Sequence, residues 1–476
     1  YSTKYNLEKI NFLKILNFIS SYLDSGNVVL KKKDELEILI ISNIVTLENL
    51  KKDLYFGNLE KSLNKKKIKT IKAFRNFTYK KSSELSKLIK NENIVFSKRS
   101  NYLAELKFLY LTFKEMLIFI FFDKYKNIEK YIILKDFVSI VSNLRLISQI
   151  EELIKVINPK IIIFTYEGHA WERLLVNLCK TKYKSINTIG YQFSTIKSNQ
   201  IGFFRKLQKN YNPDYIATTG QKTFDLIKKK INFAKIFKLG STNFIKRKTK
   251  KIKENDLLVA LDGELNELFR MVDFCIDFSR KNIEFNIIIR LHPIFKNNSK
   301  IVSKILLKIK RFKNISISRE SLEKDLQKTR YLLFTDTAIC ITCLSYNVIP
   351  IFFVNKFSKN IFDDNFPKKN IVKNTVDLKN ILKIKNNNAL THYFKNYRDK
   401  YFEKFNYDEL TKILKIKREN LFKVLKRFEG LEYRQQIIFK SKDLTIINDS
   451  KSTSFSSAVS ILKPLSYVYW IVGGLA

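Results

Sequence analysis

Two of the chain's three histidines directly follow segments that read as β-strands. His169 comes after the apolar run 160–165, and His292 comes after the run 285–291. Open parallel sheets bind ligands beyond the carboxyl ends of their strands, so both imidazoles stand where chemistry is expected. Glu167 adds a carboxylate two residues before His169. The pair suits acid/base catalysis or the binding of acceptor hydroxyls.

The sequence around each histidine also has a structural interpretation. Near the first, Gly168 allows a tight turn and Trp171 lies at the start of a helix, so the loop is either a site or a helix cap with a partly buried Trp171. Near the second, Pro293 stops strand pairing and Arg290 offers a forked cation that suits phosphate. The alternative for the second histidine is a strand-end residue with a structural role only.

Two carboxylates flank a glycine after another expected strand. Asp262 and Glu264 stand on either side of Gly263, directly beyond the run 257–261. If this turn shares a cleft with His292, one of the carboxylates is placed to act as a catalytic base. The alternative is a pair of solvated carboxylates that only cap the helix that follows.

Hydroxyl and amide side chains end two further strands. Thr335 and Thr337 close the run 331–335 and lead into an apolar helix, an arrangement that either holds a phosphate or caps that helix. Tyr191 and Gln192 end another apolar run and are again polar side chains at a strand end.

Two series of alternating strands and helices position these residues and predict two parallel sheets. The first series has strands at 36–42, 67–71, 160–165, 185–190 and 215–218, and helices at 46–63, 171–179 and 223–229. The second has strands at 257–261, 285–291, 315–318, 331–335 and 348–354, and helices at 265–280 and 301–311. The charged segment 246–256 separates the two series. We therefore predict Rossmann-like domains at 1–245 and 246–415 that face one cleft.

The composition is that of a folded protein with a strongly positive charge. Hydrophobic residues make up 45% and aromatic residues 13% of the 476 residues, and the formal net charge is +44. Disordered chains lack this much apolar material. Lysines are dispersed along the whole chain without an aromatic and basic recognition motif, so we expect no nucleic-acid partner. Abundant Lys, Ile and Asn also reflect an AT-rich genome, and the remaining effect of the charge is to favour anionic substrates and an anionic membrane surface.

The cysteines and the hydropathy of the chain favour a cytoplasmic location for the protein. Cys179, Cys275, Cys340 and Cys343 lie mostly in apolar runs, and we expect reduced core thiols rather than a metal or redox site. The most apolar run, 106–122, is too short and too charged for a membrane span. We expect a buried helix there. The alternative is a helix that lies on the inner-membrane surface.

The motifs of the first 410 residues resemble, in order, those of bacterial GT-B glycosyltransferases that build capsule, O-antigen of lipopolysaccharide and related surface polysaccharide. They are the segments 166–173, 190–192, 290–293 and 335–337, and the resemblance covers residues 30–410. It implies a nucleotide-sugar donor, CMP-activated acidic sugars being one class in the wider group. It also implies a glycan or lipid-linked acceptor, no resident cofactor and no metal.

The same resemblance implies residue roles. The donor phosphate would be bound by Arg290 and His292 with help from Thr335 or Thr337, and the base would be Asp262 or Glu264. The resemblance places Tyr191 and Gln192 on the acceptor side. Phe193, which follows them, stands where the pattern has a histidine.

Residues 416–476 carry a second resemblance, to the C-terminal domain of UDP-N-acetylmuramoylalanine:D-glutamate ligase, an enzyme of peptidoglycan synthesis. The matching segments are 428–434, 446–453 and 469–474. The resemblance implies that ATP and the amino-acid substrate would be contacted by Arg434, Asp449, Lys451 and Thr453. Only a part of that Mur ligase domain is present, and no Gly-x-x-x-x-Gly-Lys-Ser/Thr phosphate loop occurs in the chain. We therefore expect an incomplete α/β appendage without ligase activity.

Three functions follow from these observations. The first is a glycosyltransferase of surface carbohydrate synthesis. The alternatives are a ligase-related protein of peptidoglycan synthesis and an inactive fusion remnant.

Overall fold

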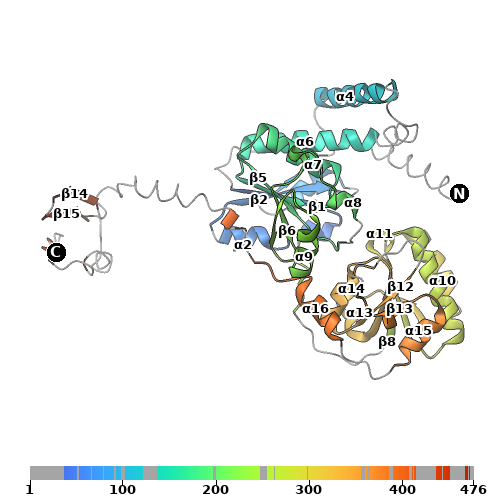
Figure 1. Cartoon of the computed structure of the whole chain (residues 1–476). Coiled ribbons are helices and arrows are strands. Elements are labelled where there is room, and N and C mark those ends of the chain that lie inside the picture. Colours follow the sequence, from blue (N-terminus) through green and yellow to red (C-terminus); the bar gives the residue numbers. More distant parts are fainter. Residues whose placement is uncertain are drawn as a thin grey trace. The chain divides into compact units, whose positions relative to one another are not determined.

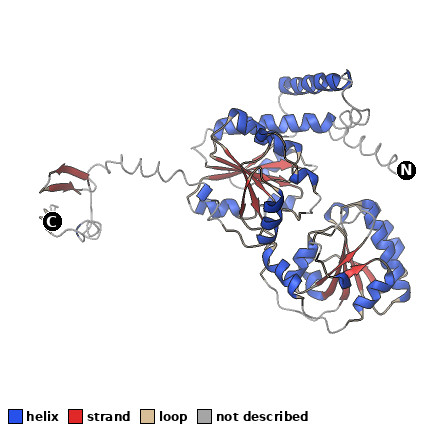
Figure 2. Ribbon diagram, in the orientation of Figure 1, coloured by secondary structure: helices blue, strands red, loops and turns tan. Residues whose placement is uncertain are grey.

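The computed structural model describes residues 37–50, 53–65, 67–78, 80–89, 93–97, 102–121, 137–196, 200–246, 255–261, 263–296, 298–354, 360–362, 365–384, 390–406, 410, 412–413, 436–441, 443–450, 462, 467–469 and 471. The chain divides into two compact units, Tyr1–Glu409 and Leu410–Ala476. The larger unit holds two parallel sheets with helices packed around them (Figure 2). The smaller unit holds a two-stranded antiparallel pair.

The first sheet is parallel and has the strand order β3-β2-β1-β4-β5-β6-β7 (Figure 1). Its strands are β1 Ile38–Ile44, β2 Thr70–Asn76, β3 Ile94–Val95, β4 Ile161–Thr165, β5 Asn187–Tyr191, β6 Tyr215–Thr218 and β7 Lys235–Lys238. The runs 38–41 and 161–164 are buried at every position, as parallel strands covered on both faces must be. The order 3-2-1-4-5-6 is that of the doubly wound Rossmann fold.

Helices cover both faces of this sheet. Strand side chains alternate between the faces, and those of Ile162 and Phe164 pack with α6 (Phe137–Ile157) and α7 (Ala170–Lys182). On the opposite face, Phe74 and Val95 pack with Leu85 of α3 (Ser82–Leu88). The remaining helices of this part are η1 Leu47–Leu50, α2 Leu59–Lys65, α8 Ile201–Phe204, η2 Lys209–Tyr211 and α9 Gln221–Lys230.

The second sheet repeats the same topology with the order β10-β9-β8-β11-β12-β13. Its strands are β8 Asn255–Ala260, β9 Ile287–Arg290, β10 Ile315–Ile317, β11 Thr329–Phe334, β12 Ile349–Phe353 and β13 Ile371–Val372. Its helices are α10 Leu265–Lys281, α11 Pro293–Lys296, α12 Ser299–Ile309, α13 Leu322–Lys328, α14 Ile339–Thr342, η3 Cys343–Tyr346, η4 Lys368–Asn370, α15 Thr375–Leu382 and α16 His392–Lys400. The predicted fold class, two Rossmann-like α/β sheets in series, is therefore confirmed. The four cysteines are buried free thiols, as expected.

After α16, the chain returns to the first sheet. The amide of Ile196 donates to the Tyr401 hydroxyl at 3.1 Å, and the amide of Glu403 donates to the Thr219 carbonyl at 2.9 Å. Sequence periodicity grouped this segment with the second sheet, because a crossing-back segment leaves no periodic signal of its own. The chain thus links the two sheets twice.

The helix expected at 46–63 forms as two short helices, η1 and α2, with a turn between them. The Asp53 carboxylate accepts hydrogen bonds from the amides of Tyr55 and Phe56, and it pairs with Lys72 of β2 at 3.1 Å. A side chain that bonds nearby amides competes with the helix, so the polypeptide turns here instead of continuing.

The apolar run that was expected to be a buried helix is an exposed one, and that prediction is wrong. It forms most of α4 (Tyr102–Phe121), which lies on the outer side of α6, away from the sheet (Figure 1). The Glu105 carboxylate forms two hydrogen bonds with the Arg145 guanidinium of α6 at 2.6 and 2.7 Å. Only one face of α4 is packed, and apolar composition alone does not ensure a partner for the other. Among the described residues, no helix is long and apolar enough to cross a membrane.

In the smaller unit, β14 (Gln436–Lys440) pairs with β15 (Thr445–Asn448) in antiparallel register. The apolar run 444–447 predicts a strand, and β15 forms over most of it. The apolar run 468–472 also predicts a strand, but its described residues 468, 469 and 471 lie outside any strand. Of the ligase-like residues, Asp449 directly follows β15, whereas Arg434, Lys451 and Thr453 lie outside the described residues.

Candidate functional site

The predicted site residues of the larger unit that the structure describes lie at the carboxyl ends of parallel strands. In each sheet, the order reverses between two central strands, β1 and β4 in the first and β8 and β11 in the second. Doubly wound sheets bind ligands beyond this switch point. Glu167 follows β4, Glu264 follows β8, and Thr335 follows β11. The two switch points therefore define two candidate sites, one for each sheet.

At the first switch point, Glu167 accepts hydrogen bonds from two neighbours. Its Oε2 lies 3.0 Å from His169 Nε2, and its Oε1 accepts from the Ser194 hydroxyl at 2.8 Å. Burial raises the pKa of Glu167, but the hydrogen bonds from His169 and Ser194 outweigh it, so the pKa lies below its ordinary value. The hydrogen bond with Glu167 raises the pKa of His169. The pair is thus a carboxylate and an imidazole prepared to carry a proton, and the His169 ring is exposed at 60%.

A second carboxylate, that of Glu172, fixes the conformation of this loop through hydrogen bonds. Glu172 Oε2 accepts hydrogen bonds from three consecutive amides, those of Glu167 at 3.0 Å, Gly168 at 2.7 Å and His169 at 2.9 Å. Burial raises the pKa of Glu172 to about 7, although these three donors favour the anion. The glutamate closes the first turn of α7 onto the loop. It therefore holds Glu167 and His169 in place.

The same loop requires a glycine. Gly168 has φ +84°, and an added Cβ would lie 1.9 Å from the Gly202 carbonyl oxygen. A residue with a side chain would be strained in this left-handed conformation and would collide with backbone. The sharp turn between Glu167 and His169 depends on it.

Removing the Glu172 carboxylate should destabilise the protein. In Glu172→Ala, three consecutive amides of the loop lose their acceptor, and we expect the free energy of unfolding to fall by about 3 kcal/mol. Glu172→Gln keeps an oxygen in place and should cost less than about 1 kcal/mol. Urea denaturation at pH 7 measures both. Equal losses for the two variants would show that the charge of Glu172 matters and its acceptor geometry does not.

Two further residues belong to this site and were not predicted. Arg75, near the end of β2, stacks its guanidinium over Trp171 at 4.3 Å and Phe77 at 4.8 Å. Burial lowers the pKa of Arg75 to about 10, so it remains a cation at neutral pH. Tyr55 packs edge-on against Phe193 at 4.7 Å. Extending the predicted strand from residue 71 to its end at 76 would have placed Arg75 at a strand end.

Tyr191 and Gln192 were predicted on the acceptor side, but both side chains are buried. The Tyr191 hydroxyl donates to the Gly240 carbonyl at 2.9 Å, and Gln192 accepts from the Thr219 amide at 3.2 Å. Their hydrogen bonds join β5 to the loops after β6 and β7. Their polar atoms are bonded to other parts of the chain, so in this structure they support the site.

At the second switch point, His292 lies beside the turn that follows β8. A Cβ added to Gly263 would lie 3.5 Å from the His292 ring, and His292 Nδ1 accepts from the Ile294 amide at 3.4 Å. Glu264 is exposed at the N-cap of α10. Asp262 lies outside the described residues. The structure thus brings the glycine turn and His292 together, as the sequence predicted.

Arg290 is held by an acidic partner. Its Nη1 lies 2.6 Å from Asp325 Oδ2 and 3.0 Å from the Glu320 carbonyl oxygen. The Ser318 hydroxyl also donates to Asp325 at 2.6 Å. The Arg290 charge is therefore largely balanced by a buried carboxylate, which weakens its predicted attraction for phosphate.

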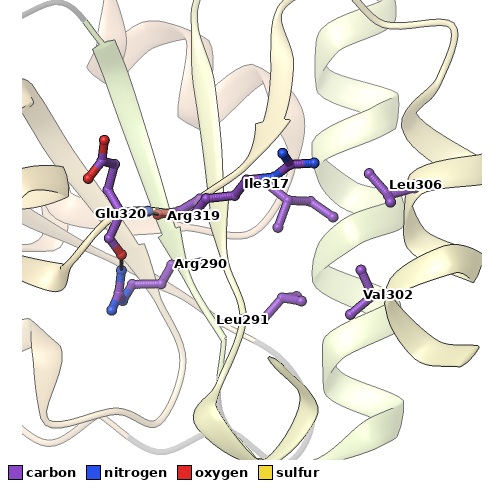
Figure 3. Close-up of a pocket in the computed structure, with 8 residues that line it drawn as sticks. Arg290, Leu291, Val302, Leu306, Ile317, Arg319 and Glu320 are labelled. Carbon is purple, nitrogen blue, oxygen red and sulfur yellow. Dashed lines mark hydrogen bonds between the residues drawn. The ribbon is translucent and has the colours of Figure 1, made fainter. Parts of the chain in front are cut away.

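Arg290 nonetheless lines a pocket of about 240 Å³ beside the carboxyl ends of β9 and β10 (Figure 3). One side of the pocket is polar and the other is apolar. Its lining consists of Arg290, Leu291, Val302, Leu306, Ile317, Ser318, Arg319 and Glu320. Such a mixed lining suits a flat apolar group with polar edges.

Thr335 is the most unusual of the predicted hydroxyls. Its side chain is 1% exposed, and its Oγ1 has no hydrogen-bond partner among the described residues. Buried hydroxyls almost always have a partner, so an orphan at a switch point is a candidate contact for a bound water or ligand. Thr337 precedes the N-cap residue of α14 and accepts from the amide of Ile339, the first residue of that helix, at 3.4 Å.

The comparisons with known proteins match a short stretch of the chain. No protein-family profile matches it. UDP-N-acetylmuramoylalanine--D-glutamate ligase of Wolbachia sp. subsp. Brugia malayi is 33% identical over 63 residues, 13% of this chain and 13% of the ligase. The same enzyme of Blochmanniella pennsylvanica is 41% identical over 68 residues, 14% of this chain and 16% of the ligase. The chain thus spans less than a fifth of the length of the curated relatives it matches.

Solved structures of similar topology cover more of the chain at low identity. MnaA of S. aureus with UDP is 11% identical and covers 80% of this chain and 97% of its own, with a TM-score of 0.48. UDP-GlcNAc 2-epimerase from Neisseria meningitidis bound to UDP-GlcNAc is 11% identical and covers 82% of this chain and 100% of its own, with a TM-score of 0.42. TarM of S. aureus is 12% identical and covers 83% of this chain and 100% of its own, with a TM-score of 0.45. Similarity of this degree concerns general topology and carries nothing about activity.

Proposed function

We propose that this protein is a glycosyltransferase that moves a sugar from a nucleotide-activated donor to a glycan or lipid-linked acceptor of surface polysaccharide. The observation that carries the proposal is the buried, orphaned hydroxyl of Thr335 at the switch point of the second sheet. A phosphate oxygen is an acceptor for such a hydroxyl. The His292 ring, at the end of a strand two positions along the same sheet, supplies a second donor.

The chemistry of the donor explains why two hydrogen-bond donors are needed. When the bond between sugar and nucleotide breaks, negative charge grows on the phosphate oxygens. Donors fixed in advance stabilise that charge more in the transition state than in the ground state. In this proposal Thr335 and His292 hold the phosphate, and the 240 Å³ pocket beside β9 holds the nucleobase against Leu291 and Ile317.

The acceptor hydroxyl must lose a proton as it attacks. Glu167 is the base we favour, because its lowered pKa keeps it ionised at neutral pH and His169 can carry the proton onward. The carboxylates around Gly263 remain the alternative base. We place the transfer in the cytoplasm at the inner-membrane surface, where a lipid-linked acceptor would be found.

A thermal-shift screen with nucleotide sugars tests this function. One donor class, such as UDP-, CMP- or GDP-activated sugars, should raise the melting temperature, since ligand at a hundred times Kd stabilises the folded state by about 2.7 kcal/mol. The matched sugar without its nucleotide should have no effect. If no nucleotide sugar stabilised the protein, but D-glutamate-dependent ATP consumption were found, the ligase alternative would replace the transferase.

A further inference from the structure

An apolar face of α4 is exposed on the outside of the larger unit. It consists of side chains that point away from α6, and we call it the α4 outer face. Its members are Leu103, Leu106, Tyr110, Phe113, Leu117 and Phe121. Exposure reaches 82% for Leu103, 63% for Leu106 and 78% for Phe121. A contiguous apolar surface on a folded protein marks a site of interaction.

The opposite face of α4 fixes the orientation of the helix. Glu105, Phe108 and Thr112 are buried, and Glu105 forms a bidentate ion pair with the buried Arg145 of α6. Residues three, four and seven apart share one side of a helix, so these three form one packed stripe. The outer face is therefore a fixed feature of the surface.

Among the described residues of α4, positive charge borders the outer face without a matching negative charge. Lys107 and Lys114 are exposed, and their spacing of seven residues places them on the same side of the helix as Tyr110. Glu105 is buried against Arg145. Glu115 lies about 100° around the helix from Lys114. The outer face thus offers apolar and cationic groups together.

We propose that the α4 outer face docks on an anionic lipid bilayer. A helix of this kind lies in the membrane plane, with its apolar side chains among the upper acyl chains and its lysines at the lipid phosphates. The net charge of +44 adds long-range attraction to such a surface. A second copy of the chain fits less well, since a two-fold contact would bring Lys107 and Lys114 against the same lysines without carboxylates between them. The inference deepens the proposed contact with the inner membrane and rests on that part of the proposed function.

Vesicle flotation with the full chain tests this inference. We expect binding to phosphatidylcholine vesicles that contain 30% phosphatidylglycerol, a composition we set, and much weaker binding to pure phosphatidylcholine. The variant Leu106→Ser/Phe113→Ser/Leu117→Ser should lower the partition coefficient by about a hundredfold or more, because it removes apolar groups that docking would bury in the bilayer. Lys107→Glu/Lys114→Glu should lower it by about 25-fold or more.

The controls separate a specific surface from general stickiness. Ile283→Ser/Leu307→Ser removes side chains of 77% and 73% exposure from the second sheet's helices and loops, and it should leave binding unchanged. Lys281→Glu/Lys310→Glu is the matched charge control and should have a small effect. All variants should melt at the wild-type temperature, since the changed side chains are exposed.

Several outcomes would overturn the inference. Equal binding to pure phosphatidylcholine, or equal losses in the control variants, would reject an anionic docking face. A lower melting temperature of the serine variant would mean that another part of the chain covers the face. A dimer that the serine variant abolishes, without vesicle binding, would assign the face to a second copy. A donor-induced thermal shift without vesicle binding would remove the membrane contact alone, whereas vesicle binding without any donor shift would remove the transferase alone.

Discussion

Glu167→Gln should lower the rate of sugar transfer by roughly a hundredfold to ten-thousandfold, the range that general acid/base groups contribute. Glutamine keeps the size of the side chain and can still accept from Ser194, but it cannot take a proton from the acceptor hydroxyl. The folded structure should be preserved, because the loop is held by Glu172 and not by Glu167 itself. The measurement is kcat with the donor that the screen identifies, beside thermal melting of both proteins.

Glu152→Gln, at an exposed position of α6, is the matched control and should transfer sugar at the wild-type rate. A Glu167→Gln protein with nearly normal kcat would reject Glu167 as the base. The base would then be one of the carboxylates beside Gly263, and Glu264→Gln would be the next variant to measure.

His292→Ala should lower kcat by about a hundredfold or more, as the loss of one donor to a developing anion does elsewhere. The imidazole in this account contacts the leaving phosphate, so its removal should affect kcat more than donor binding. Thermal stability should change little, because the ring is partly exposed and its hydrogen bond with the Ile294 amide is long, 3.4 Å.

The third histidine provides the control. His392 is exposed on α16, and His392→Ala should leave both kcat and melting unchanged. Normal turnover by a well-folded His292→Ala protein would leave His292 with the structural role that its strand-end position also allows. A large loss of stability would likewise show that its effect on rate is indirect.

The positions of strand ends could be predicted from the sequence, and with them most of the candidate site. Buried parallel strands are nearly continuous apolar runs, so the strands at 161–165 and 329–334 can be predicted from the sequence. The polar residues directly after them are then predicted to lie at the strand ends. The ends of strands with charged residues were harder to place. Lys72 and Arg75 interrupt β2, whose true end lies five residues beyond the predicted one.

What the sequence could not supply were the tertiary partners. Nothing in the pattern tells that Arg290 meets Asp325, 35 residues away, or that Tyr191 turns into the core to bond Gly240. The α4 helix was misjudged for a related reason. A strongly apolar helix is expected to be buried. Burial on all sides also requires a second surface to pack on the helix, and the described residues provide one on one side only.

The most direct test of donor binding at the second switch point is calorimetric titration of nucleoside phosphates into the wild type, Thr335→Val and Glu167→Gln. We expect the wild type to bind the nucleotide of its donor, and Thr335→Val to bind it about tenfold or more weakly, because a hydrogen bond to a charged group is lost while the shape is kept. Glu167→Gln should bind it as tightly as the wild type. Unchanged affinity in Thr335→Val, with a loss in Glu167→Gln, would contradict the assignment of the donor to the second sheet.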